Sequence, residues 1–254
     1  MASRRHLGVL CSGIASRRER SAPRPSSATE RAAWRADVKS ISVGHPFEEL
    51  HARPAPLRGV AAASVRVPPL EAHGHAILDG PLISTPRLTL VAATAAILDA
   101  ELEGPEALSS VLSAVVPEGW PPGEYDRPAI EFFRARIAEQ PQMADWYAWY
   151  AISRGLAPPT LVASGGYFGP PLPDGIVEIG YSVVPAQERR GYATELVGAL
   201  VQHAFSDPRV SRVIAHTDET NLASVTVLRR NGFLPSSVSF EPGRLEFILA
   251  RSET

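Results

Sequence analysis

The sequence predicts an α/β protein built on a mixed, mostly antiparallel sheet that is flanked by helices. Three strand patterns follow one another between residues 145 and 184, with only short turns between them. Two helix patterns then alternate with a strand, and the chain ends in a hairpin pattern. Strands joined by short turns pair antiparallel, whereas parallel strands need a crossover of about a dozen residues. A repeated chain of strand–helix–strand units is therefore not expected.

The first expected strand covers residues 85–93, where apolar and polar residues alternate and the leucines share one face. Two short helices are predicted over residues 94–116, with a break at Gly104 and Pro105. A proline-rich loop over residues 117–128 precedes an amphipathic helix at residues 129–140. The apolar positions of that helix recur on one face: Ile130, Phe133 and Ile137.

The next strands are rich in aromatic and β-branched residues, which suit a pleated sheet. They are expected over residues 145–154, 160–169 and 176–184. A helix with one apolar stripe is predicted over residues 194–205, and a short buried strand over residues 212–217.

The C-terminal elements complete the sheet. A short helix is predicted with Thr220 as its N-cap and Gly232 as its stop. Residues 233–240 and 244–250 are expected to pair as a hairpin.

Composition indicates an ordinary globular protein, because 44% of the 254 residues are hydrophobic and 20% are charged. The single cysteine, Cys11, excludes a disulfide framework and a zinc cluster, and it favours a reducing, cytoplasmic location. No apolar stretch reaches the roughly 18 residues of a membrane helix, so no membrane partner is expected. His73 and His75 alternate, but Gly74 makes that segment soft, and no metal is expected.

Residues 1–80 are predicted to be a disordered basic extension, rich in Arg, Ala, Pro and Ser, ahead of one domain at residues 81–254. Residues 1–36 hold eight arginines and two glutamates, a net charge of +6, so the rest of a chain of charge −2 carries about −8. An acidic body argues against a nucleic-acid partner. A disordered tail, an over-long gene start, a transit peptide and an export signal remain alternatives for the extension.

The stretch "GYSVVPAQERRGYATELVGAL", residues 180–200, predicts an anion site. A strand that turns into a helix directs free backbone N–H groups and the positive end of the helix dipole at one place. Gly191 allows close backbone approach and Ala193 keeps the next contact small, while Arg189 and Arg190 add charge. The chain lacks the G-x-x-x-x-G-K-[ST] and G-x-G-x-x-G motifs, which argues against nucleotide hydrolysis and dinucleotide binding.

The turn reads Glu188-Arg189-Arg190-Gly191-Tyr192-Ala193, and a second motif follows about 30 residues later: Asn221, Ser224, Arg230, Gly232 and Phe233. Together the two motifs resemble the GCN5-related N-acetyltransferase (GNAT) family, in particular the branch with the ribosomal-protein N-terminal acetyltransferases. The resemblance covers about residues 84–251. The family's first motif is [Q/R]-x-x-G-x-[G/A], and Glu188 departs from it by placing a carboxylate near a pyrophosphate.

The resemblance implies the GNAT fold, a sheet of about seven strands that splays between the family's fourth and fifth strands, here residues 176–184 and 212–217. It implies acetyl-CoA as co-substrate and transfer of the acetyl group to a primary amine, either of a protein N-terminus or of a small molecule. A non-catalytic acyl-CoA-binding sensory domain is the alternative. The implied coenzyme contacts are Ser182, Val183, Val184, Arg189, Arg190, Gly191, Tyr192, Ala193, Thr194, Asn221 and Arg230.

Glu178 is the first candidate for the base that removes the amine proton. Strand alternation puts Glu178 on one face with Gly180 and Ser182, inside an apolar run where a carboxylate needs a reason. An edge-exposed or salt-bridged glutamate is the alternative. His216 is the second candidate base, against a plain surface histidine, and Ser224 the candidate proton donor to the thiolate, against an ordinary helix hydroxyl.

Trp120 is the candidate acceptor-pocket residue, because it lies in a loop between prolines where core burial is less automatic. The other aromatic residues are expected to pack in the core and sheet: Trp146, Tyr147, Trp149 and Tyr150. The sequence leaves a monomer and a homodimer open.

Overall fold

The computed structural model describes residues 80–123, 125–236 and 242–252. The predicted basic extension before residue 80, including His73 and His75, lies outside the described residues, as does part of the expected C-terminal hairpin.

The described residues form one open sheet of eight strands in the order β1-β2-β3-β4-β5-β6-β8-β7. The strands are β1 (Leu82–Ser84), β2 (Leu88–Ala92), β3 (Ala148–Ser153), β4 (Thr160–Tyr167), β5 (Ile176–Val183), β6 (Arg212–Asp218), β7 (Leu234–Pro235) and β8 (Arg244–Ala250). All neighbours pair antiparallel except β5 and β6, which are parallel. The mostly antiparallel prediction is confirmed, and β1 is the one strand that it missed.

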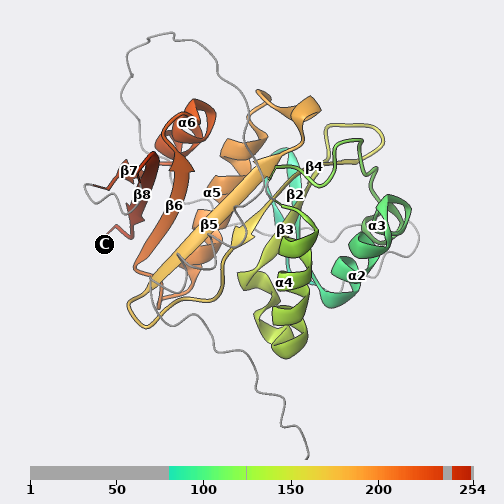
Figure 1. The fold of residues 1–254 in the computed structure, drawn as a ribbon, viewed down its shortest axis with the longest axis horizontal. Helices are drawn as coiled ribbons and strands as arrows, with labels where there is room; N and C mark the ends of the chain where they lie inside the picture. Colours follow the sequence, from blue (N-terminus) through green and yellow to red (C-terminus); the bar gives the residue numbers. More distant parts are fainter. Residues whose placement is uncertain (1–79, 124, 237–241, 253–254) are drawn as a thin grey trace, which may run out of the picture.

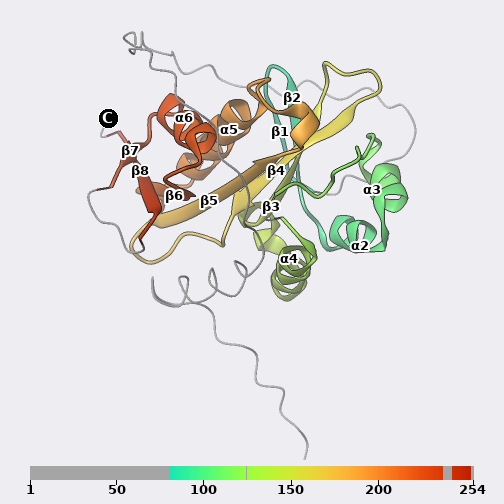
Figure 2. The same cartoon turned by 45° about the horizontal axis from the view of Figure 1, so that its top comes forward.

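Helices cover both faces of this sheet, so the domain has three layers (Figures 1 and 2). The helices are α2 (Ala95–Glu103), α3 (Pro105–Leu112), α4 (Arg127–Glu139), α5 (Tyr192–Ser206) and α6 (Leu222–Arg230). The first three bury their apolar stripes on one face, and the predicted stripe of α4 is confirmed. The last two pack on the opposite face, which carries the larger core.

The sheet opens between β5 and β6, near the middle of Figure 1. Residues 176–179 of β5 pair with residues 212–215 of β6. Beyond that point residues 180–183 pair with β4 alone, and residues 216–218 pair with β8 alone. The expected splay between the two strands is therefore present, and it begins at Ile179 and Ala215.

The structure corrects several boundaries. The strand predicted from residue 85 begins at Leu88, because residues 85–87 form the turn after β1. The strand predicted from residue 145 begins at Ala148, because residues before it form the short 3-10 helix η1 (Pro141–Trp146), which starts at a proline. The N-cap of α6 is Asn221, not Thr220: the helix begins at Leu222, and the Asn221 side chain accepts a hydrogen bond from the Ser224 N–H at 3.0 Å.

Two other predicted boundaries are confirmed. The break between the first two helices falls at Gly104, and Gly232 follows the end of α6 with a left-handed φ of 84°. Within the part of the chain that the structure describes, no helix is long and apolar enough to cross a membrane.

Candidate active site

The turn between β5 and α5 presents a row of backbone N–H groups beside the β5–β6 opening. Gly191 precedes α5 with a left-handed φ of 80°, and Arg189 also has a left-handed φ, of 58°. Within the described residues, the N–H groups of residues 189–194 donate to no backbone or side-chain acceptor. Unpaired N–H groups at a helix N-terminus suit a diphosphate, so the turn fits the pyrophosphate of coenzyme A.

Arg87, in the turn between β1 and β2, braces this loop. Its Nε donates to Glu195 Oε2 at 2.7 Å, and its Nη1 donates to the Arg190 carbonyl at 2.7 Å. The guanidinium also lies 5.0 Å from the centre of the Tyr192 ring. A Cβ on Gly191 would lie 3.3 Å from Arg87 Nη2, which is a second reason for glycine at that position. Sequence reasoning missed Arg87, because the contact joins segments about 100 residues apart.

The second half of β5 offers backbone groups to the opening. The Val184 N–H donates to the Val162 carbonyl at 3.0 Å, so its backbone faces β4. Backbone groups of successive strand residues point to opposite edges, so those of Val183 and Tyr181 face the opening. Of the three coenzyme contacts predicted on this strand and at its end, this geometry favours Val183 over Ser182 and Val184.

Glu178 lies at the base of the opening and is 7% exposed. His216, the first β6 residue beyond the paired segment, places Nδ1 3.1 Å from Glu178 Oε1 and Nε2 3.2 Å from Glu246 Oε2 on β8. The two candidate bases are therefore in contact, and neither is an exposed surface residue. The alternative of a salt-bridged Glu178 stays open, because the contact with His216 becomes an ion pair when the imidazole is protonated. Glu246 was missed, although it interrupts an apolar strand just as Glu178 does.

Ser224 lies across the opening, on α6. Its Oγ is 2.9 Å from the Tyr181 hydroxyl, which comes from the β5 face opposite to Glu178. Burial raises the pKa of Tyr181 to about 12, and the hydrogen bond with Ser224 opposes that rise. Tyr181 therefore stays protonated at neutral pH and can donate. The alternation of β5 predicted the face on which Tyr181 lies, but it did not predict that Ser224 is its hydrogen-bond partner.

The two predicted coenzyme contacts on α6 lie at opposite ends of that helix. Asn221 is exposed and caps α6 with its side-chain oxygen, which leaves its amide nitrogen for a ligand. Arg230 is exposed at the far end of α6. Glu188 is exposed, and its side chain forms no hydrogen bond or ion pair with the described residues, so the carboxylate does not occupy the N–H cradle through a contact of its own.

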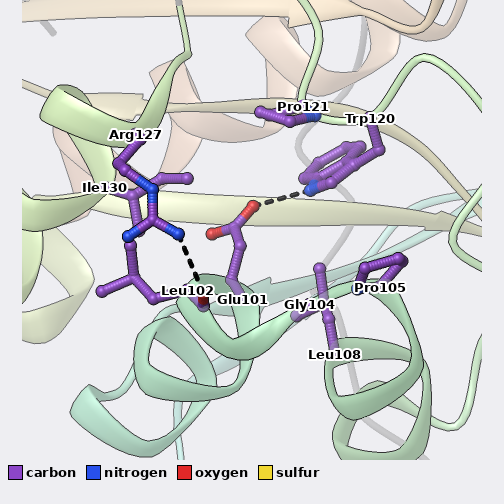
Figure 3. Close-up of a pocket in the computed structure, with 9 residues that line it drawn as sticks. All are labelled: Glu101, Leu102, Gly104, Pro105, Leu108, Trp120, Pro121, Arg127 and Ile130. Carbon is purple, nitrogen blue, oxygen red and sulfur yellow. Dashed lines mark hydrogen bonds between the residues drawn. The ribbon is translucent and has the colours of Figure 1, made fainter.

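Trp120 lines an open cavity of about 190 Å³ between α2, α3 and the start of α4, shown in Figure 3. Its indole Nε1 donates to Glu101 Oε1 at 2.6 Å. The other aromatic residues are buried as expected, at 6% exposure or less: Trp146, Tyr147, Trp149 and Tyr150. Sequence reasoning missed Glu101, although it lies one turn after the buried Ile97 and so shares the inner face of α2.

Comparisons with known proteins agree with this architecture. A family model described as an acetyltransferase (GNAT) domain matches residues 87–234, more than half of the chain. An uncharacterised N-acetyltransferase of Bacillus subtilis, YjdG, is 27% identical over 160 residues, which cover 63% of this chain and 94% of the relative.

Two solved structures are similar in fold. An acetyltransferase from Agrobacterium tumefaciens is 20% identical, with a TM-score of 0.46, and the match covers 67% of this chain and 95% of that one. A putative ribosomal-protein-serine acetyltransferase from Vibrio cholerae is 20% identical, with a TM-score of 0.45 and a match over 67% and 97% of the two chains.

The fold and the family model define the class of protein. The chain belongs to the GNAT acetyltransferase family. It is an N-acetyltransferase, and its co-substrate is acetyl-CoA.

Proposed function

We propose that this enzyme transfers the acetyl group of acetyl-CoA to a primary amine by direct attack of the amine on the thioester. The observation that carries the proposal is the opening between β5 and β6. One end of it adjoins the free N–H groups of residues 189–194, and its base holds the Glu178–His216 contact. If the pyrophosphate of acetyl-CoA lies on the turn, the rest of the molecule extends along β5 and brings the thioester toward that base.

Glu178 accepts the proton of the attacking amine. An α-amine has a reference pKa of about 7.7–8.0 and a lysine amine of about 10.4, so most acceptors arrive protonated at neutral pH. A proton taken up at Glu178 Oε1 can pass to His216 Nδ1, while the proton on Nε2 passes to Glu246 Oε2. The relay keeps the charge of the imidazole constant and returns Glu178 to its ionised form.

Ser224 protonates the leaving thiolate. When the amine nitrogen bonds to the acetyl carbon, the carbon–sulfur bond breaks and the electron pair stays on sulfur. The Ser224 hydroxyl then gives its proton to sulfur, and Tyr181, at 2.9 Å, gives its own proton to Ser224. Solvent reprotonates Tyr181. Acid and base act from opposite faces of the sheet, which matches attack on one side of the thioester and departure on the other.

The test is release of free thiol from acetyl-CoA across a panel of amines that includes N-terminal peptides and small amines. The wild-type enzyme is expected to release thiol with at least one amine, and Glu178→Gln to lower kcat by about 10² or more. Glu188→Gln, at an exposed position on the turn, serves as a control with kcat near wild type. Coenzyme binding without thiol release from any amine would instead support a non-catalytic binding domain. Unchanged turnover in Glu178→Gln would remove Glu178 as the base.

The acceptor is proposed to be a protein N-terminus or a small-molecule amine. The acidic charge of the chain beyond residue 36 supports a cationic acceptor over nucleic acid. The active form is proposed to be a monomer or a homodimer, which the elution volume of the purified enzyme distinguishes.

A further inference from the structure

Three neutral donors hold the carboxylate of Glu101 inside an aromatic cluster. Oε1 accepts from Trp120, and Oε2 accepts from the hydroxyls of Tyr125 at 2.9 Å and Tyr150 at 2.5 Å. Among the described residues, no basic side chain forms an ion pair with Glu101. The fold thus holds a partly buried carboxylate that has hydrogen bonds but no counter-ion. Burial raises the pKa of Glu101, and the hydrogen bonds from Tyr150, Trp120 and Tyr125 oppose that rise. A cation beside the carboxylate would further favour its ionised form.

The space beside Glu101 suits a cation on an apolar chain. The cavity is walled by the Trp120 ring and by the aliphatic residues Pro105, Leu108 and Ile130, as Figure 3 shows. Its volume of about 190 Å³ exceeds that of an engineered cavity of about 150 Å³ that binds benzene. The rings of Trp120 and Tyr150 lie 5.9 Å apart, and aromatic faces attract cations.

Arg127 lines the same cavity but does not neutralise Glu101. Its Nη2 donates to the Leu102 carbonyl at 3.0 Å, and its Nη1 lies 3.4 Å from Glu131 Oε1. In Figure 3 the guanidinium turns toward Leu102. Glu103, Glu106 and Glu118 are exposed on α2, on α3 and in the loop before Trp120, and their negative charge favours the approach of a cation to this part of the domain.

The cavity lies on the same face of the sheet as Glu178 and near the coenzyme strand. Tyr150 on β3 pairs with Ser164 on β4, and Ser164 pairs with Ser182 on β5, so the three stand in one row across the sheet. Two strand spacings make that row about 10 Å long. The loop that carries Trp120 also reaches the coenzyme strand, because a Cβ on Gly123 would lie 2.3 Å from Ser182 Oγ. Tyr150 and Ser164 are themselves buried, so it is the Trp120 loop that lies between the cavity at Glu101 and the opening between β5 and β6. A flexible chain of roughly 10 Å or more that passes this loop would join the two sites.

We propose that Glu101, with the Trp120 ring, binds a second positively charged group of the acceptor, roughly 10 Å or more from the amine that is acetylated. The acceptor class is a molecule with two cationic groups joined by a flexible apolar chain. A polyamine has this chemistry, and so does a peptide whose N-terminus is followed by a lysine or arginine. This inference rests on the proposed function, because it assigns the acceptor of the same site.

The first experiment compares steady-state thiol release with α,ω-diamines of three to ten methylene groups and with monoamines of equal length. The wild-type enzyme is expected to have a lower KM for the longer diamines. Glu101→Gln should raise that KM by about 10- to 100-fold, with kcat within about twofold and the monoamine KM unchanged. Glu139→Gln, exposed at the end of α4 and away from the residues that line the cavity, is the matched control and should behave as wild type. Peptides with and without a lysine after the N-terminal residue distinguish the two kinds of acceptor. A lower KM for the lysine peptide than for any diamine would identify a peptide acceptor, and the reverse order would identify a polyamine.

The second experiment does not need catalysis. Calorimetric titration of the same α,ω-diamine series into the coenzyme A-loaded enzyme should show binding of the longer diamines, and Glu101→Gln should weaken that binding by about 10- to 100-fold. If no amine on the panel releases thiol, the proposed function is contradicted, but the titration still tests whether Glu101 binds the cation.

Folding of the variants is checked by their coenzyme A affinity, which should equal that of the wild type. Should Glu101→Gln fail to fold, Trp120→Ala replaces it and is expected to weaken diamine binding selectively. Equal KM values for diamines and monoamines, or diamine binding that is unchanged in Glu101→Gln, would show that the carboxylate merely anchors the tyrosines and would overturn the inference.

Discussion

Arg87 donates its Nε to Glu195 Oε2 at 2.7 Å and thereby ties the turn before β2 to the first turn of α5. The same guanidinium donates to the Arg190 carbonyl, so one side chain holds both ends of the loop predicted to bind the pyrophosphate. The pair positions the loop from outside it, and two predictions follow from this arrangement.

Arg87→Ala is expected to weaken coenzyme A binding by about three- to tenfold, because the loop loses a brace and the site loses a positive charge. The expected loss of affinity is modest because the Arg87 side chain is 46% exposed, and solvent screens ion pairs at exposed positions. Isothermal titration calorimetry checks the affinity. Arg134→Ala, which removes the ion pair with Asp99 between α4 and α2 on the other face of the sheet, is the control and should bind coenzyme A as the wild type does. Equal affinity in both variants would contradict the bracing role.

Glu195→Gln is expected to lower the melting temperature at neutral pH, with a difference from wild type that shrinks in acid. Burial alone would raise the pKa of Glu195, but hydrogen bonds from Thr85 and Arg87 and the charge of Arg87 together lower it. An acid whose pKa is lowered by folding stabilises the protein above its ordinary pKa, here 4.5, and that stabilisation is lost as pH falls through the lower folded pKa. Thermal melts of both proteins from pH 7 down to pH 3 test this. A constant difference across that range would contradict it.

Glu246→Gln is expected to lower kcat by about tenfold while coenzyme A affinity stays unchanged. Glutamine cannot take the proton from His216 Nε2, so Glu178 would return to its ionised form more slowly. The loss should be smaller for weakly basic amines, which arrive largely neutral and give up fewer protons. The measurement is kcat against pH for a strongly and a weakly basic acceptor. An equal loss for both acceptors would point to a structural role for Glu246.

Ser224→Ala is expected to lower kcat by about 10- to 100-fold and Tyr181→Phe by less, because Tyr181 acts through Ser224. Since the two hydroxyls form one hydrogen-bonded unit, the double variant should be little worse than Ser224→Ala. Single-turnover thiol release by the three variants checks this. Losses that multiply in the double variant would show that the two hydroxyls act independently.

Local pattern determined much of the fold. The period of the apolar residues predicted the inner face of α4 and both faces of β5, because a residue's place on a helix or strand follows from its spacing alone. The anion cradle was equally local, since one turn of chain supplies the backbone groups and Gly191. The extent of η1 and the cap of α6 were missed, because several neighbouring residues could have filled each boundary position.

Tertiary structure decided the contacts between distant segments. Strand pairing brings Glu178 and His216 together across 38 residues, and Glu246 joins them from β8. The sequence by itself gave each residue a face, but it could not say which faces meet. Tertiary structure likewise decided the contact of Arg87 with Glu195, and the contacts of Glu101 with Trp120 and Tyr150. A side chain's own spacing sets its direction, whereas its partner depends on the order of strands in the sheet, which packing of the whole chain selects.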